Sequence, residues 1–166
     1  MKIEQTSLDG VLKITHDVFE DHRGYYSEIY NKDFFNDNSI DVDFIQDDIS
    51  VSSKNVFRGI HGDFRTWKLI TCLFGSFYLV VVNNHKDHQQ YLKYESFTLS
   101  EKNKVQILVP PGFGNGHLVL SDKAIFHYKQ NTNYDRSTQF TIKWNDERIK
   151  IWYPHENFIT SIRDEP

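Results

Sequence analysis

The segment 68–82, KLITCLFGSFYLVVV, joins two runs of β-branched, aromatic and other apolar residues at a single glycine, Gly75. Residues of these types favour extended backbone, and a glycine between two such runs is typical of a turn. The segment therefore predicts two consecutive strands, at residues 68–74 and 76–82. Asn83 and Asn84 follow the second run and mark its end.

Short apolar runs closed by turn residues continue through most of the chain. Residues 94–99 alternate between apolar or aromatic and polar side chains, which is the period of a half-buried strand. A short helix is expected at residues 32–36. Short strands with almost no helix predict an all-β antiparallel sandwich or barrel. Further strands are expected at residues 105–109, 117–120, 124–129 and 139–144.

The composition of the 166 residues fits a folded domain and excludes several classes of protein. Thirteen Phe, nine Tyr and three Trp exclude a disordered chain, and a lone cysteine, Cys72, excludes a disulfide scaffold. The net charge is −4 and there is no basic run, which argues against a general nucleic-acid binder. No repeat or linker divides the sequence, so we expect one domain over residues 1–166, with residues 152–166 packed along the barrel.

The sequence also carries no membrane or export signal. No apolar stretch approaches the ~20 residues that span a bilayer, and residues 1–5 lack the apolar core of a signal peptide. We therefore expect a soluble cytoplasmic protein with no membrane partner. An open barrel needs polar side chains that point inward to act on a ligand, and four clusters could supply them, at residues 19–28, 55–63, 110–118 and 125–129.

The spacing within the second cluster predicts which side chains share a face. On an extended strand Arg58, Ile60 and Gly62 point one way, whereas His61 and Asp63 point the other way. A histidine next to a glycine on a strand is also compatible with a purely structural, hydrogen-bonded role. The residues alone leave these two interpretations of His61 open.

The residues of the other three clusters are likewise compatible with either a functional or a purely structural role. Asn115 and His117 are two residues apart, so on a strand they face the same side, as do Phe126 and Tyr128. The glycines of residues 110–116 also fit a turn between two strands. A tyrosine of an all-β protein usually serves to pack against neighbouring side chains rather than to react. Residues 19–28 fit either a solvated hairpin tip or an arginine aimed at an anion.

A metal site is not expected. Small β-barrels that bind a metal usually carry a His-x-His pair with a nearby Glu on one strand. Here Asp63 takes the place of the second histidine after His61, and no glutamate follows before Glu95. Isolated histidines do not make a convincing set of ligands.

Eight short motifs lie in the same order as in a known family. FEDHRG at 19–24 resembles F-x-D-x-R-G, QDDIS at 46–50 resembles Q-x-N-x-S, and RGIH at 58–61 resembles R-G-L-H. The chain thereby resembles the nucleotide-sugar 3,5-epimerases typified by dTDP-4-dehydrorhamnose 3,5-epimerase. The remaining motifs are KL at 68–69, PGFG at 111–114, YK at 128–129, WND at 144–146 and SIRD at 161–164.

The resemblance implies a fold, an assembly and a reaction. The fold is a cupin-type jelly-roll barrel, the assembly is a homodimer, and no cofactor or metal is required. The reaction is epimerisation at C3 and/or C5 of a nucleotide-diphosphate 4-keto sugar. A carbon beside the ketone loses a proton because the carbanion is an enolate, and an acid returns a proton to the opposite face.

The resemblance also assigns catalytic roles to residues. His61 is the base, and Asp164 is the partner that fixes its tautomer. Lys68 stabilises the enolate oxygen, and Tyr128 is the acid on the opposite face of the sugar.

Further roles follow from the family pattern. The second donor of the family is a histidine at the place of Asn115, and His117 follows two residues later, so we expect these two residues to share that role. The residues expected to bind the substrate are Arg23 and Arg58 at the pyrophosphate, with Glu28, Gln46 and Asp48 at the nucleotide end. Arg23 is expected to reach the site of the partner subunit.

Departures from the family pattern leave the substrate open. Gly62 replaces an aromatic residue, Asn115 replaces a histidine, and Asp48 replaces an asparagine. RGIHGD and WNDERI resemble more closely the branch that acts on GDP-4-keto-heptoses in capsule or surface polysaccharide biosynthesis. The nucleotide, the sugar and the number of inverted carbons stay open. Two alternatives are a 3,4-ketoisomerase of the same barrel class and a non-catalytic sugar-binding barrel.

Overall fold

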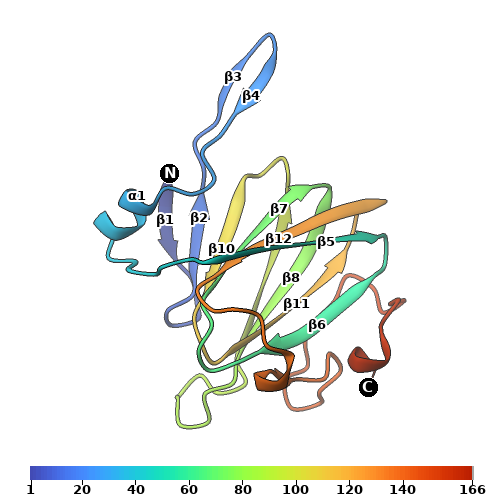
Figure 1. The fold of residues 1–166 in the computed structure, drawn as a ribbon. Coiled ribbons are helices and arrows are strands. Elements are labelled where there is room, and N and C mark those ends of the chain that lie inside the picture. Colours follow the sequence, from blue (N-terminus) through green and yellow to red (C-terminus); the bar gives the residue numbers. More distant parts are fainter. Residues whose placement is uncertain (166) are drawn as a thin grey trace.

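The computed structural model describes residues 1–165, which form two antiparallel sheets that face each other (Figure 1). The all-β prediction is confirmed. The six-stranded sheet has the order β1 (Lys2–Gln5), β2 (Leu12–Thr15), β10 (Val105–Val109), β7 (Lys68–Phe74), β12 (Lys123–Gln130) and β5 (Gln46–Ser53). The five-stranded sheet has the order β13 (Phe140–Thr141), β6 (Phe57–Gly62), β11 (Phe113–Val119), β8 (Ser76–Asn83) and β9 (Tyr94–Ser100).

Smaller elements surround the two sheets. The hairpin of β3 (Phe19–Asp21) and β4 (Gly24–Tyr26) projects away from the barrel (Figure 1). The expected short helix is α1 (Lys32–Asp37), and the side chain of Asn31 caps it by accepting a hydrogen bond from the Phe34 N–H. Two 3₁₀ turns are η1 (Arg136–Thr138) and η2 (Ile162–Asp164). Within residues 1–165, no helix is both long and apolar enough to cross a membrane.

The turn at Gly75 carries the chain from one sheet to the other. Strands β7 and β8 are consecutive, as predicted, but β7 lies in the six-stranded sheet and β8 in the five-stranded sheet. Gly75 has a φ of +71°, and a Cβ atom there would lie 2.1 Å from the Lys123 carbonyl oxygen. Only glycine fits this crossing without strain.

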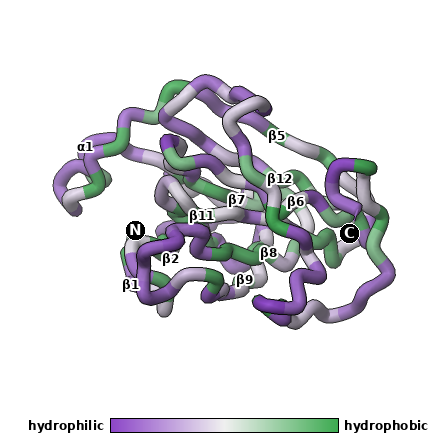
Figure 2. Tube along the Cα trace, turned by 90° about the horizontal axis from the view of Figure 1, so that it is seen from below, coloured by the Kyte–Doolittle hydropathy of each residue, from purple (hydrophilic) through white to green (hydrophobic). Residues whose placement is uncertain are grey.

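The core lies between the two sheets. Ile70 and Ile107 from one sheet and Phe77, Leu79 and Val81 from the other are fully buried against each other. The chain is largely hydrophobic along β7 and β8, which belong to the two facing sheets (Figure 2). Burial of this apolar surface holds the two sheets at a fixed separation.

The C-terminal segment, residues 152–165, packs against the five-stranded sheet, as expected. Tyr153 and Phe158 contact the Phe57 ring, with centroids 5.7 and 5.1 Å away. Ile159 forms a β-bridge with Val56 at the start of β6. Pro166 lies outside the described residues. The segment thereby brings η2 beside β6.

Two sequence expectations need correction. Gly112 lies in a turn, as expected, but Gly114 and Gly116 belong to β11, which begins at Phe113 and is buried along its whole length. Its glycines allow neighbouring side chains to approach, since a Cβ at Gly114 would lie 2.8 Å from Cγ2 of Ile60. At residues 139–144 only Phe140–Thr141 forms a strand.

The predicted facing of Arg58 on β6 is also wrong, whereas Ile60 and His61 face opposite sides as predicted. Across β11, His61 pairs with Asn115 and Arg58 pairs with His117, so three residue steps on β6 match two on β11. This register shift places Arg58 and His61 on the same side of the strand instead of on opposite sides. Both side chains line one pocket.

Replacing Gly59 by alanine should destabilise the fold strongly. Gly59 has a φ of +125°, and a Cβ there would lie 2.4 Å from the Gly116 Cα. We expect the free energy of unfolding, measured with urea, to fall by about 2 kcal/mol or more, because backbone strain and a backbone clash add. Gly24→Ala is the matched control, since its φ is +123° with no atom within 4 Å. Equal losses in both variants would contradict the role of the close approach.

Candidate active site

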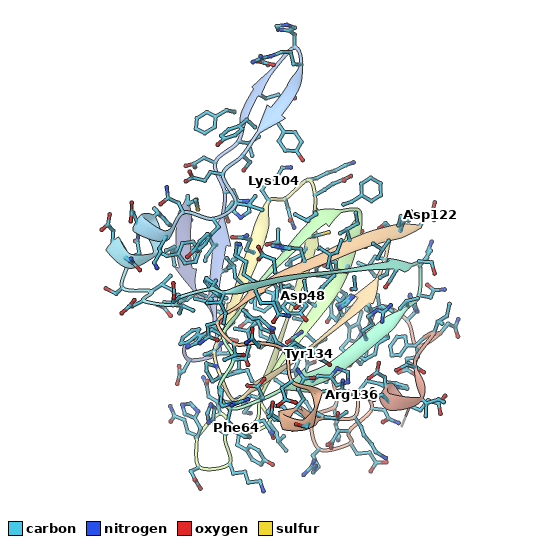
Figure 3. All side chains as sticks on the ribbon, in the orientation of Figure 1. Asp48, Phe64, Lys104, Asp122, Tyr134 and Arg136 are labelled. Atoms are coloured by element: carbon cyan, nitrogen blue, oxygen red, sulfur yellow. The ribbon has the colours of Figure 1, made fainter. Side chains whose placement is uncertain are left out.

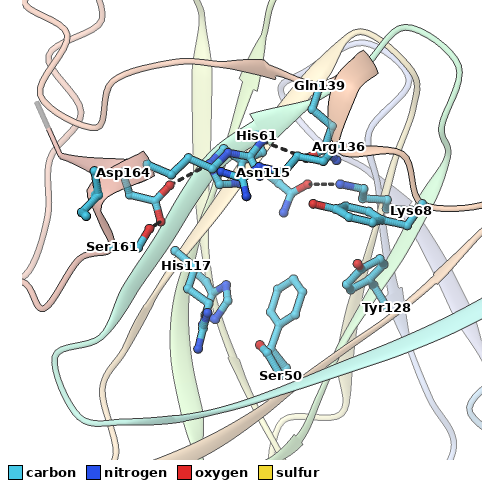
Figure 4. A pocket seen from close by; sticks show the side chains of 15 residues that line it. Ser50, His61, Lys68, Asn115, His117, Tyr128, Arg136, Gln139, Ser161 and Asp164 are labelled. Atoms are coloured by element: carbon cyan, nitrogen blue, oxygen red, sulfur yellow. Dashed lines mark hydrogen bonds and ion pairs between the residues drawn. The ribbon is translucent and has the colours of Figure 1, made fainter.

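A pocket of about 580 Å³ lies between the two sheets, and both sheets line it (Figure 4). The five-stranded sheet contributes Arg58, His61, Asn115 and His117, and the six-stranded sheet contributes Ser50, Lys68, Phe126 and Tyr128. The loop after β12 and the C-terminal segment complete the lining with Tyr134, Arg136, Gln139, Ser161, Ile162, Arg163 and Asp164.

The structure brings His61 and Asp164 together. The Nε2 atom of His61 lies 2.7 Å from Oδ1 of Asp164, although the ring N–H is not aligned with that oxygen as a straight hydrogen bond requires. The Ser161 hydroxyl donates to the other carboxylate oxygen at 3.1 Å. Asp164 therefore faces Nε2, and Nδ1 of the ring is left for other contacts.

Asp164 is an ionised partner for His61 at neutral pH. Burial raises the pKa of Asp164, but the contacts with His61 and with Ser161 outweigh it, so that the pKa lies below its usual range. A carboxylate beside the ring can stabilise positive charge that develops on the imidazole during a reaction. The pair can therefore accept a proton and hold the resulting charge.

Lys68 is a buried ammonium group in the wall opposite the His61–Asp164 pair. Its side chain is 8% exposed, and Nζ lies 3.4 Å from Oδ1 of Asn115 and 5.5 Å from the centre of the Tyr128 ring. Burial lowers the pKa of Lys68, and the carboxylate of Asp63 opposes this shift only in part. Asn115 holds Lys68 with its oxygen, which leaves the amide NH₂ as a further donor.

Tyr128 enters the pocket from the six-stranded sheet, on the same side as Lys68 (Figure 4). Burial and the nearby Asp48 carboxylate raise the pKa of Tyr128. Asp48 is the direct partner of Tyr128 across β5 and β12, and it accepts a hydrogen bond from Gln46 at 2.7 Å. The phenol therefore keeps its proton over the ordinary pH range.

The pocket carries more positive charge than the protein as a whole. Arg58, Lys68, Arg136 and Arg163 line it together with one carboxylate, Asp164, whereas the net charge of the chain is −4. Such a concentration of cations suits a substrate with a negatively charged group. Among residues 1–165, no group of three His, Cys, Asp or Glu is placed to hold a metal ion.

Some residues predicted from the sequence lie outside the pocket of the same chain. Arg23 lies exposed on the projecting hairpin, where it pairs with Asp21. Glu28 accepts a hydrogen bond from Asn31 at 3.1 Å. Gln46 and Asp48 lie on β5 beside Tyr128, on the same face of the sheet, but they do not line the pocket. The structure brings together the remaining predicted residues: His61, Lys68, Asn115, His117, Tyr128, Asp164 and Arg58.

Sequence reasoning missed several residues that line the pocket. Arg163 lies next to Asp164 within SIRD, and its guanidinium donates to Oε1 of Gln139 at 3.0 Å. A basic residue beside the predicted carboxylate was a usable signal. Tyr134 and Arg136 lie in a loop without a motif, so nothing in the sequence indicated them.

Comparisons with known proteins agree on one family. The sequence profile described as dTDP-4-dehydrorhamnose 3,5-epimerase matches residues 5–166. The dTDP-4-dehydrorhamnose 3,5-epimerase of Escherichia coli (strain K12) is 38% identical over 170 residues, which cover 99% of this chain and 92% of the relative.

Solved structures give the same result. The enzyme of that name from Elizabethkingia anophelis has a TM-score of 0.92 and 35% identity, with 99% of this chain and 93% of the other covered. The dTDP-6-deoxy-D-glucose-3,5-epimerase of Legionella pneumophila, in complex with dTDP-4-keto-L-rhamnose, has a TM-score of 0.94 and 30% identity, with 98% and 89% covered.

The cupin-type jelly-roll fold and these relatives define the class of protein, an isomerase that acts as an epimerase. Within that class, the chain belongs to the dTDP-4-dehydrorhamnose 3,5-epimerase family. The family and the fold predicted from the sequence are therefore confirmed, as is the prediction of an enzyme.

The buried Lys68 should limit activity at alkaline pH. Its pKa is lowered by burial, so it loses its positive charge at a lower pH than an ordinary lysine, whose pKa is ~10.4. Above that pH it cannot stabilise an oxyanion, and we expect kcat/KM to fall. Tyr128, with a raised pKa, stays protonated there. A pH profile of kcat/KM checks this, and Lys68→Arg should move the alkaline limit upward; an identical limit in that variant would contradict it.

Proposed function

We propose that the protein epimerises a nucleoside-diphosphate 4-keto sugar through an enolate. One observation carries the proposal: a candidate base, His61, comes from one sheet, and a candidate acid, Tyr128, comes from the other, with the buried Lys68 ammonium beside the acid. Epimerisation removes a proton from one face of the sugar and returns a proton to the other face, so it needs a base and an acid on opposite walls of the pocket.

The first step is removal of a proton from a carbon next to the ketone. His61 takes the proton at Nδ1, because Nε2 faces Asp164. The imidazolium that forms is stabilised by the ionised Asp164. Asp164 thus acts on the reaction through His61.

The charge that develops on the ketone oxygen needs donors that are already in place. Lys68 supplies a buried ammonium, and Asn115, which accepts from Lys68 at 3.4 Å, has an amide NH₂ to donate. This contact supports Lys68 and Asn115 as the oxyanion donors, with His117 two residues further along β11. The proposal therefore gives the second-donor role, first expected to be shared, to Asn115.

Proton return is the second step. Tyr128 donates its phenolic proton to the face opposite His61, and its neighbour Lys68 stabilises the phenolate that forms. The configuration of the carbon is inverted because the new proton arrives on the face opposite the one that lost its proton.

The relatives suggest the substrate. Matches of 30–38% identity act, by their names, on dTDP-4-dehydrorhamnose or contain dTDP-4-keto-L-rhamnose, so we propose a dTDP-4-keto sugar as the first substrate. Arg58, Arg136 and Arg163 offer donors to its pyrophosphate. The departures at Gly62 and Asn115 make a GDP-4-keto-heptose the second substrate to test. One domain, a cytoplasmic location and a role in capsule or surface polysaccharide biosynthesis stay predictions.

We also propose that the enzyme is a homodimer in which the β3–β4 hairpin reaches a second copy. The hairpin projects from the barrel together with its side chains (Figure 3). Phe19, Tyr25 and Tyr26 of this hairpin are between 57% and 68% exposed. Exposed aromatic side chains of this kind mark contact surfaces. Arg23 at its tip is remote from the pocket of its own chain, so it would serve the partner's pyrophosphate site. A monomer by sedimentation would contradict this arrangement.

His61→Asn should abolish proton exchange. With a dTDP-4-keto-6-deoxy sugar in deuterated water, we expect the wild type to incorporate deuterium next to the ketone and His61→Asn to incorporate none, because the base is gone. Mass spectrometry measures the incorporation. Asp164→Asn should keep slow exchange, since His61 remains without its ionised partner. Exchange at the wild-type rate in His61→Asn would contradict the assignment.

Tyr128→Phe should separate exchange from inversion. The variant keeps His61 and Lys68, so proton removal continues, but no phenol is present to return a proton to the opposite face. We expect deuterium to enter the substrate without a change of configuration at the carbon that Tyr128 serves, followed by NMR. Full inversion at the wild-type rate would show that another group is the acid.

A further inference from the structure

The pocket continues beyond Lys68 and Asn115 to an inner end lined by Ser50, His117 and Phe126 (Figure 4). His117 is 3% exposed, and its ring stacks on that of Phe126 with centroids 4.1 Å apart and planes inclined by 8°. The two rings come from opposite sheets, so this contact fixes the imidazole where it faces the pocket.

Two polar atoms at this inner end have no hydrogen-bond partner among residues 1–165. They are Nε2 of His117 and Oγ of Ser50, and both are buried. A buried polar atom without a partner costs free energy, so such an atom usually serves a ligand or a solvent molecule. Ser50 and His117 belong to facing walls of the pocket, so the two atoms together form a candidate site for one polar ligand group.

The charge state of His117 suits an uncharged group. Burial, with the nearby Arg58, lowers the pKa of His117 to about 3, so the imidazole is neutral at physiological pH. A neutral imidazole offers one donor and one acceptor, and a serine hydroxyl can do both. A sugar hydroxyl, which also donates and accepts, matches this pair.

The distance from the ketone site argues against the C3 hydroxyl and is compatible with a hydroxyl on the chain attached to C5. His117 lies two residues beyond Asn115 on β11, which corresponds to about 6.6 Å along a strand. A hydroxyl on C3 stays beside the ketone oxygen because its carbon is bonded to C4. A chain attached to C5 can extend away from the ketone, and a hydroxyl on it can reach the inner end.

We propose that Ser50 and His117 form a subsite for a hydroxyl group on the chain attached to C5 of the sugar. This inference rests on the proposed function and adds a preference within it, for 4-keto sugars that are hydroxylated at C6 or beyond over 6-deoxy sugars. A methyl group at C6 leaves both polar atoms unpartnered, and a site built to bind a hydroxyl discriminates against the analogue that lacks it.

The test compares dTDP-4-ketoglucose with dTDP-4-keto-6-deoxyglucose, which differ by the C6 hydroxyl. The measured quantity is the ratio of their kcat/KM values for deuterium incorporation next to the ketone, which should exceed one in the wild type. His117→Phe keeps a ring that can stack on Phe126 but removes both nitrogen atoms, and we expect the ratio to fall about tenfold. Ser50→Ala should lower it in the same direction by a few-fold.

His127→Phe is the matched control. His127 is a similarly buried histidine on β12, but its side chain points to the face of the sheet opposite that of Tyr128 and contacts Asp47 outside the pocket. The ratio of the two kcat/KM values should therefore keep its wild-type value in this variant. An equal fall for both sugars in His117→Phe, or an unchanged ratio, overturns the subsite. A wild type that exchanges no proton in either sugar, nor in a GDP-4-keto-heptose, overturns the proposed function itself, and the subsite with it.

Discussion

The close approach of β6 to β11 is the constraint on which the site depends. A Cβ atom at Gly59 would lie 2.4 Å from the Gly116 Cα, and one at Gly62 would lie 2.2 Å from the Phe113 carbonyl oxygen. Hydrogen atoms alone fit at these points, and the register shift between the strands lies within this contact. Because of the shift, Arg58 and His61 both reach the pocket, so a steric property of the backbone determines the charge and the chemistry inside the barrel.

The facing sheets provide the second constraint. His61 and Asn115 belong to one sheet and Lys68 and Tyr128 to the other, so the spacing between proton acceptor and proton donor is set by the packed core between the sheets. Burying the Lys68 ammonium costs free energy that this core offsets. The site thereby trades some stability for donors that need no rearrangement during the reaction.

The sequence indicates the strands well because alternation and turn residues are local properties. It also indicates the pairing of His61 with Asp164 through motifs of a known family. The sequence could not show the register shift at His61, because a shift is a property of the pairing between two strands. The sequence of β6 by itself has the pattern of a regular strand. Arg136 was missed because its segment carries no motif and no periodicity, whereas Arg163 stood beside the predicted carboxylate and could have been inferred. Arg23 was correctly placed on a hairpin, but only the structure shows how far that hairpin projects from its own pocket (Figure 1).

The attachment of the C-terminal segment has a consequence for thermal behaviour. Asp164 is held by η2 and by the bridge between Ile159 and Val56, outside the hydrogen-bonded ladders of the two sheets. Segments held by few contacts open at a lower free energy than central strands. Opening of this segment would remove the carboxylate from His61 while the barrel stays folded. The orientation of the imidazole therefore has the local stability of the C-terminal segment, and heat would disorder the pair before it melts the sheets.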